Sequence, residues 1–260
     1  MNEHTQDSDD TAGRFSPRIE AIETQWSMVR KAHHDSINSA EDAKKHLVMR
    51  YSSAIRGYIQ AITKNADDVD EISQDVFVRI LNGDFAGADP DRGRFRDLLK
   101  VAVRNMVRNF WAKQNRRRHP ELQEDAIEAV ENDNIEDDPW SINWRNNLLE
   151  ITWQSLRQFE EERKNSVAFT VLRIRTQNPN ADSKQLAELL SQKTGRTFTA
   201  PATRQQLHRA RIRFAELLVE EIAQGLDVAE PDRIQEELIS LGLYERIRDV
   251  LPEQWATMKK

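Results

Sequence analysis

Apolar side chains recur every three or four residues along much of the chain, which is the spacing of one face of an α-helix. The spacing predicts helices over residues 42–63, about 67–81 and about 95–113. The third has a continuous apolar stripe, and the chain is punctuated by Asn82–Gly83–Asp84 after the second. The stripe comprises Phe95, Leu98, Leu99, Ala102, Val103, Met106, Val107 and Phe110.

Helical periodicity returns in the second half of the chain, where it predicts a pair of helices joined by a turn. Asp182 is expected to cap the first helix of the pair, with Gln185 three residues later as in a capping box. The turn is expected over residues 191–198, and Thr199 is expected to cap the second helix. Since every predicted element is helical, the sequence predicts an all-α fold.

The same pattern predicts two small helical domains joined by an acidic linker. The expected segments are a disordered tail (1–22), a first domain (23–118), the linker (119–143), a second domain with a helix-turn-helix outline (144–225) and a tail helix (226–260).

Composition narrows the possible functions. The 260 residues include no Cys, which excludes disulfides, iron–sulfur clusters and Cys-ligated zinc. No apolar run approaches the roughly 18 residues that a membrane span needs. The polar, acidic first residues do not resemble a secretory signal. We therefore expect a soluble, cytoplasmic protein without a membrane partner.

The net charge is −6, but the charges are strongly segregated along the chain. Residues 92–118 contain ten Lys or Arg and the single acid Asp97, whereas residues 121–138 contain nine acids and no Lys or Arg. A second basic cluster spans residues 203–213. Local basic blocks indicate a polyanionic partner, and the aromatic pair at 110–111 suits stacking on unpaired bases. A solvated helix face is the alternative interpretation.

Evidence for catalysis is scarce. The acids Asp67, Asp68 and Glu71 could hold magnesium in an all-α enzyme, but such enzymes need a second acidic motif, and the other acid pairs lie in polar or linker sequence. No His pair has helical ligand spacing, and no Gly-rich phosphate loop is present. We expect no enzyme activity, no catalytic residue, no metal and no cofactor. A magnesium enzyme and a structural helical adaptor remain as alternatives.

Several segments together resemble the sigma-70 family of bacterial transcription initiation factors, in its two-domain extracytoplasmic-function (ECF) type. The helix that begins Asp68-Val-Asp-Glu-Ile-Ser-Gln-Asp-Val-Phe resembles the family's polymerase-binding helix, and residues 95–111 resemble its promoter-melting helix. Leu207-His-Arg-Ala-Arg resembles the end of its recognition helix. The segments at Thr24-Gln-Trp-Ser-Met-Val and Asp89-Pro-Asp-Arg-Gly are similar to a divergent, planctomycete-like branch.

The resemblance implies a sigma factor that binds core RNA polymerase, recognises a promoter and stabilises the melted minus-ten element. Its implied contacts to the clamp coiled coil of the polymerase are Asp68, Asp70, Glu71, Gln74 and Asp75. Those implied for the minus-ten DNA are Arg94, Arg96, Arg104, Asn105, Arg108, Asn109, Trp111, Lys113, Arg116 and Arg117. Those implied for the minus-thirty-five DNA are Thr203, Arg204, Gln205, His208, Arg209 and Arg211.

The resemblance also implies an anti-sigma factor or another regulator as a possible partner. The turn at residues 191–198 is longer than the family's usual turn. A helix-turn-helix regulator that acts without polymerase is the main alternative, but it leaves the acidic helix at 67–81 and the aromatic-basic helix at 95–113 without a role.

Overall fold

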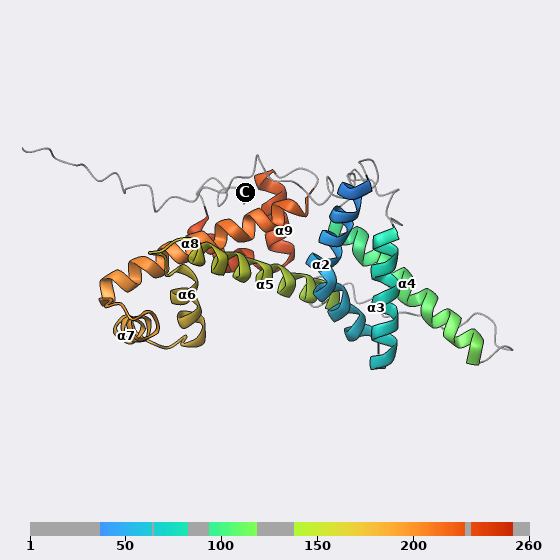
Figure 1. The fold of residues 1–260 in the computed structure, drawn as a ribbon, viewed down its shortest axis with the longest axis horizontal. Helices are drawn as coiled ribbons and strands as arrows, with labels where there is room; N and C mark the ends of the chain where they lie inside the picture. The colour runs from blue at the N-terminus through green and yellow to red at the C-terminus, as the bar shows by residue number, and fades with distance from the viewer. Residues whose placement is uncertain (1–36, 64, 83–93, 119–137, 227–229, 252–260) are drawn as a thin grey trace, which may run out of the picture. The chain divides into compact units, whose positions relative to one another are not determined.

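The structure is a computed structural model that describes residues 37–63, 65–82, 94–118, 138–226 and 230–251. Every regular element within these ranges is helical, which confirms the predicted all-α fold (Figure 1). None of the described helices is both long enough and apolar enough to cross a bilayer. The predicted tail (1–22), the loop after Asp89 as far as residue 93, most of the acidic linker (119–137) and residues 252–260 lie outside the described ranges.

The described helices follow one another in the order labelled in Figure 1. They are α2 (Ile37–Ile62), α3 (Ala66–Asn82), α4 (Phe95–Arg118), α5 (Pro139–Glu161), α6 (Ala168–Gln177), α7 (Ser183–Thr194), α8 (Ala200–Gln224), α9 (Pro231–Ser240), α10 (Tyr244–Ile247) and the 3₁₀ turn η3 (Arg248–Val250).

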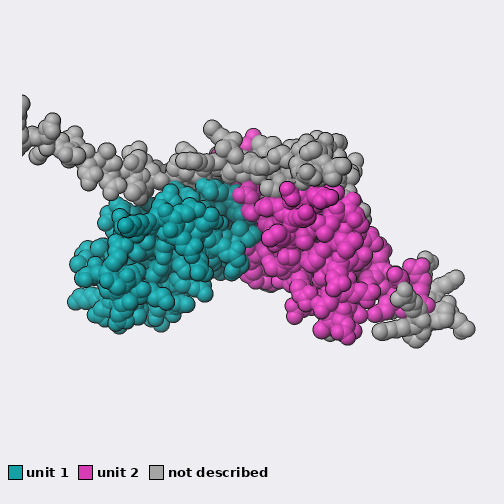
Figure 2. Space-filling view, viewed as in Figure 1, with its two compact units in different colours: residues 1–18, 149–221, 244–260 teal, residues 19–148, 222–243 magenta. Residues whose placement is uncertain are grey.

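The chain divides into two compact units (Figure 2). Unit 1 comprises residues 1–18, 149–221 and 244–260, and unit 2 comprises residues 19–148 and 222–243. Helices α5 and α8 each contribute residues to both units. Helix α9, which belongs to the predicted tail, falls in unit 2. The predicted domain boundaries themselves stay predictions.

The core of unit 2 is built from the apolar faces of α2, α3 and α4. Helix α2 contacts both α3 and α4, and α3 also contacts α4. The buried residues recur at helical spacing on each helix, so one face of each is turned to the core. They are Tyr51, Ile55 and Ile59 on α2, Val69, Ile72, Val76 and Ile80 on α3, and Phe95, Leu99, Val103 and Val107 on α4.

The first turns of α5 complete unit 2, although their first residues were expected in the linker. Trp144 stacks on Tyr51 with ring centroids 4.6 Å apart, and Trp140 meets the Tyr58 ring edge-on at 5.2 Å. Trp140 is 1% exposed. The helix starts at Pro139, which suits the first helical position, and the buried tryptophans explain why it forms before Trp144.

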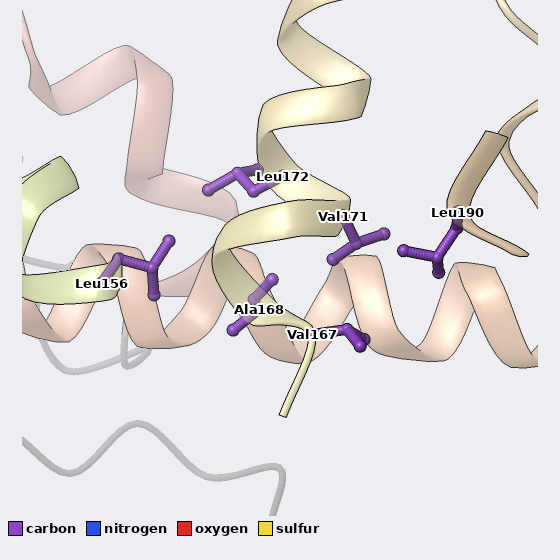
Figure 3. Close-up of a cluster of buried hydrophobic side chains, with 7 residues drawn as sticks. Leu156, Val167, Ala168, Val171, Leu172 and Leu190 are labelled. Carbon is purple, nitrogen blue, oxygen red and sulfur yellow. The ribbon is translucent and has the colours of Figure 1, made fainter. Parts of the chain in front are cut away.

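Unit 1 is organised around a buried cluster drawn from four helices (Figure 3). Its members are Leu156 of α5, Val167, Ala168, Val171 and Leu172 at α6, Leu190 of α7 and Ala210 of α8. The predicted capping box of α7 is confirmed: Asp182 Oδ1 accepts hydrogen bonds from Lys184 N and Gln185 N, and Gln185 Oε1 accepts one from Asp182 N.

The turn between α7 and α8 is shorter than the sequence predicted. Helix α7 continues past Ser191 to Thr194 and ends at Gly195, whose φ of 69° is the left-handed conformation that glycine adopts without strain. Thr199 then caps α8, its Oγ1 accepting a hydrogen bond from Ala202 N at 3.3 Å. The expected turn over residues 191–198 is therefore reduced by one helical turn.

Candidate nucleic-acid interface

The acidic face of α3 is turned away from the core. Four of the predicted polymerase contacts are exposed on it: Asp70, Glu71, Gln74 and Asp75. The opposite face carries the buried residues of the unit 2 core. The predicted core position of Ile80 is confirmed, and Phe77 is half-buried.

Some of these acids already have partners within unit 2. Asp70 Oδ1 lies 2.5 Å from Arg56 Nη2, and both side chains are more than half exposed. The half-buried Asp68 accepts a hydrogen bond from Gln114 Nε2 at 3.2 Å. Exposed ion pairs contribute little stability, so they can exchange for a partner's cations at small cost.

The polar face of α4 is largely open. Arg104 and Trp111 are half-buried, and the other described members are exposed: Asn105, Arg108, Asn109, Lys113 and Arg116. The side chain of Arg117 lies outside the described residues. The cations and the indole therefore lie outside the packed core, as a nucleic-acid surface requires.

Two predicted DNA contacts at the other end of this helix differ from the expectation. Arg96 is buried, with its Nη1 2.9 Å from Glu237 Oε1 of α9. Arg94 Nη1 is 2.5 Å from Glu237 Oε2, and Arg94 Nη2 is 3.7 Å from Glu236 Oε2. As placed, neither guanidinium is free for a phosphate, because a carboxylate already holds both.

The start of α5 contributes a further acid beside α4. Lys100 Nζ donates a hydrogen bond to Asp138 Oδ2 at 2.7 Å. The pKa of the Tyr58 phenol is raised, first by burial and then by the negative charge of Asp138, while the positive charge of Arg104 opposes the rise. The phenol of Tyr58 therefore responds to charges on both α4 and the start of α5.

In unit 1, α8 presents most of the predicted minus-thirty-five residues to solvent. Arg204, Gln205, His208 and Arg211 are exposed and Arg209 is half-buried. Thr203 is a correction: it is 1% exposed, and its Oγ1 donates to Thr199 O at 3.0 Å. The hydroxyl is spent on the preceding helical turn, so Thr203 cannot read a base edge from this position.

No group of three or more His, Asp or Glu side chains is placed to hold a metal ion among the residues that the structure describes. Asp67 and Glu71, from the acid cluster considered for magnesium, are exposed near the start of α3.

Comparison with known families identifies the segment that carries the α3 and α4 surfaces. Residues 47–117 match the family model of sigma-70 region 2. The match supports a sigma-70 family sigma factor, and it covers most of α2, all of α3 and α4 up to its penultimate residue. A search of curated proteins found no significant match, and neither did a search of solved structures.

Sequence reasoning missed the acids that cover the start of the region 2 promoter-melting helix. Glu237 follows Ile234 by three residues and precedes Leu238, so it occupies a position on the buried face of α9. A carboxylate at a core position requires a cationic partner. That signal indicates a buried ion pair, but it does not tell which cation provides it.

Proposed function

We propose that the chain is an ECF-type sigma factor that directs core RNA polymerase to promoters and stabilises the melted minus-ten element. The observation that carries the proposal is the open polar face of α4 within the segment that matches sigma-70 region 2. The proposed place of action is the cytoplasm, where polymerase and chromosome meet.

The exposed face of α3 is the proposed polymerase contact. Its acids, above all Asp70, Glu71 and Asp75, would pair with a basic coiled coil on the polymerase clamp. Charge complementarity of this kind sets partner choice and speeds association more than it raises affinity. The exposed pair between Asp70 and Arg56 holds the carboxylate only weakly, which supports its availability.

The open face of α4 is the proposed contact with the melted strand. Arg108, Lys113 and Arg116 would neutralise phosphates, while Trp111 offers a ring for an unstacked base. Binding that is specific for single strands shifts the duplex towards opening, because only the open form gains these contacts. No covalent step is required.

Unit 1 is proposed to read the minus-thirty-five element through α8. Arg204 and Gln205 lie in the first turns of that helix and are exposed, as in helices that place their N-terminal residues against base edges. His208 and Arg211 follow at helical spacing on the same exposed side. The same surface would serve a regulator that acts without polymerase, so the two functions must be separated by experiment.

Run-off transcription with purified core polymerase and genomic fragments tests the proposal. We expect transcripts that depend on the chain. Asp70→Lys with Gln74→Ala should lower polymerase capture about tenfold or more, because like charges would face the clamp. Glu41→Lys with Gln60→Ala, an equal charge change at exposed positions of α2, is the control and should leave capture unchanged.

The melting role needs a separate variant. Trp111→Ala with Asn105→Ala should retain polymerase capture but lose open complexes, measured by permanganate reactivity of unpaired thymines. Met49→Ala with Asn146→Ala, at exposed positions on α2 and α5, serves as the control. Promoter binding by the chain alone together with no polymerase capture would favour the polymerase-independent regulator.

A further inference from the structure

The N-terminal end of α4 carries an anion site that is filled by the chain's own carboxylate. The backbone carbonyl of Arg94 accepts hydrogen bonds from Asp97 N and Leu98 N, so Arg94 sits at the start of the helix. Arg96 follows in the first turn. Two guanidinium groups at the positive end of a long helix favour an anion there.

Glu237 of α9 supplies that anion. Its Oε2 is 2.5 Å from Arg94 Nη1 and its Oε1 is 2.9 Å from Arg96 Nη1, so both oxygens are used. The Arg96 and Glu237 side chains are only 8% and 5% exposed. Ser240 Oγ lies 3.3 Å from Glu237 Oε2 and helps to hold the carboxylate in place.

The hydrogen bonding of Arg96 is incomplete. Its Nη1 lies near Glu237, but neither Nη1 nor Nε makes a hydrogen bond of good geometry with any described residue. Burial of a charged group with unmet donors costs free energy. A phosphate, which accepts paired hydrogen bonds from guanidinium, would satisfy these donors better than the present carboxylate does.

Helix α9 is held on unit 2 by a modest apolar face. Ile234 and Leu238 are fully buried, whereas Glu236 and Ile239 are exposed. Arg145 Nη1 donates to Leu241 O at 3.3 Å and ties the end of the helix to α5. A ten-residue helix held in this way can be displaced, yet its attachment to the same chain keeps its carboxylate at high local concentration.

We propose that α9 is an autoinhibitory cover: Glu237 competes with nucleic-acid phosphates for Arg94 and Arg96, and α9 must leave before these two arginines bind DNA. The inference rests on the proposed function for its biological meaning, since a sigma factor needs its DNA-binding cations masked until polymerase is engaged. The chemistry that displaces the cover is a single-stranded nucleic-acid backbone.

The test uses the full-length chain and a fluorescein-labelled single-stranded DNA of mixed sequence, without polymerase. Glu237→Gln keeps the shape and removes the charge, and it should raise DNA affinity roughly three- to tenfold in fluorescence anisotropy at low salt. Glu236→Gln is the matched control, because Glu236 is 68% exposed and 3.7 Å from Arg94, and it should change affinity less than about twofold. Adding Arg94→Gln to Glu237→Gln should remove the gain.

Equal or weaker DNA binding by a folded Glu237→Gln variant overturns the proposal, because Glu237 would then position the arginines instead of masking them. If the variant does not fold, hydrogen exchange of the unaltered chain decides. Amides of α9 should lose protection when DNA saturates the protein, and unchanged or increased protection overturns the proposal.

Failure of the proposed function looks different. Unmasking by Glu237→Gln without polymerase capture by any variant would leave the cover standing and remove the sigma factor role. Polymerase-dependent transcription together with DNA affinity that is unaffected by Glu237→Gln would do the reverse.

Discussion

The two ends of α4 carry the same kind of side chain in different states. At its N-terminal end, Arg94 and Arg96 pair with Glu237 and Lys100 pairs with Asp138. At its C-terminal end, Lys113 and Arg116 are exposed. One basic block in the sequence thus becomes a covered end and an open end, defined by these residues. The difference teaches that a local charge count does not measure the charge available to a partner.

The largest expected effect comes from removing the packing under the covered end. Trp140→Ala should lower the free energy of unfolding by about 3–5 kcal/mol, because a fully buried indole is replaced by a cavity. Urea denaturation followed by circular dichroism measures the loss. Trp111→Ala, the same change at the half-buried indole of the open end, should cost about 1 kcal/mol or less. Equal losses would show that the two ends are packed alike.

The open end should dominate DNA binding in the unaltered chain. Replacing Arg108, Lys113 and Arg116 together with alanine should weaken single-stranded DNA binding roughly 30-fold at low salt, since three phosphate contacts are lost. The slope of log affinity against log salt should fall by about 2 in anisotropy titrations. Arg94→Gln, at the covered end, should change affinity less than about twofold because Glu237 already occupies that cation. A larger loss from Arg94→Gln than from the triple change would invert the comparison.

The sequence predicted the open end better than the covered end, for a physical reason. Apolar spacing is local, so the buried face of α4 and the exposure of Arg108 and Asn109 follow from the stripe that begins at Phe95. The pairing of Arg94 with Glu237 joins residues 143 positions apart and depends on where α9 packs. No periodicity reports that distance.

The same argument holds in unit 1. The capping box at Asp182 was predictable because its hydrogen bonds span three residues. The end of α7 at Gly195 was predicted too early because Ser191 is polar, although its Oγ donates to Ala187 O within the helix. The burial of Thr203 depended on how α8 is rotated against its neighbours.

A smaller effect is expected from the partly exposed ion pair of the covered end. Lys100→Ala should lower the free energy of unfolding by about 1 kcal/mol, because Asp138 is 13% exposed and would lose its cation, while Lys100 itself is 35% exposed and screened by solvent. Lys113→Ala at the open end should change it by less than about 0.5 kcal/mol. Thermal unfolding of both variants measures the contrast, and a cost at Lys113 that matches the cost at Lys100 would contradict it.

The smallest effect is a pH dependence at Tyr58, which feels both ends of α4. Its folded pKa is raised above 10.0 by burial and by Asp138. A raised pKa means that the folded state holds the phenol proton more tightly than the unfolded state does. The stabilising contribution is therefore complete below about pH 10 and is lost as the pH rises through the folded pKa.

Tyr58→Phe isolates this contribution. The free energy of unfolding of the unaltered chain should fall more steeply between about pH 10 and 11 than that of the variant, as measured by urea titrations at each pH. Asp138→Asn should lower the Tyr58 pKa and Arg104→Gln should raise it further, because the two charges act in opposite directions. Identical pH profiles for the unaltered chain and Tyr58→Phe would show that the phenol ionises in the folded state as it does in water, and that neither the covered end nor Arg104 acts on it.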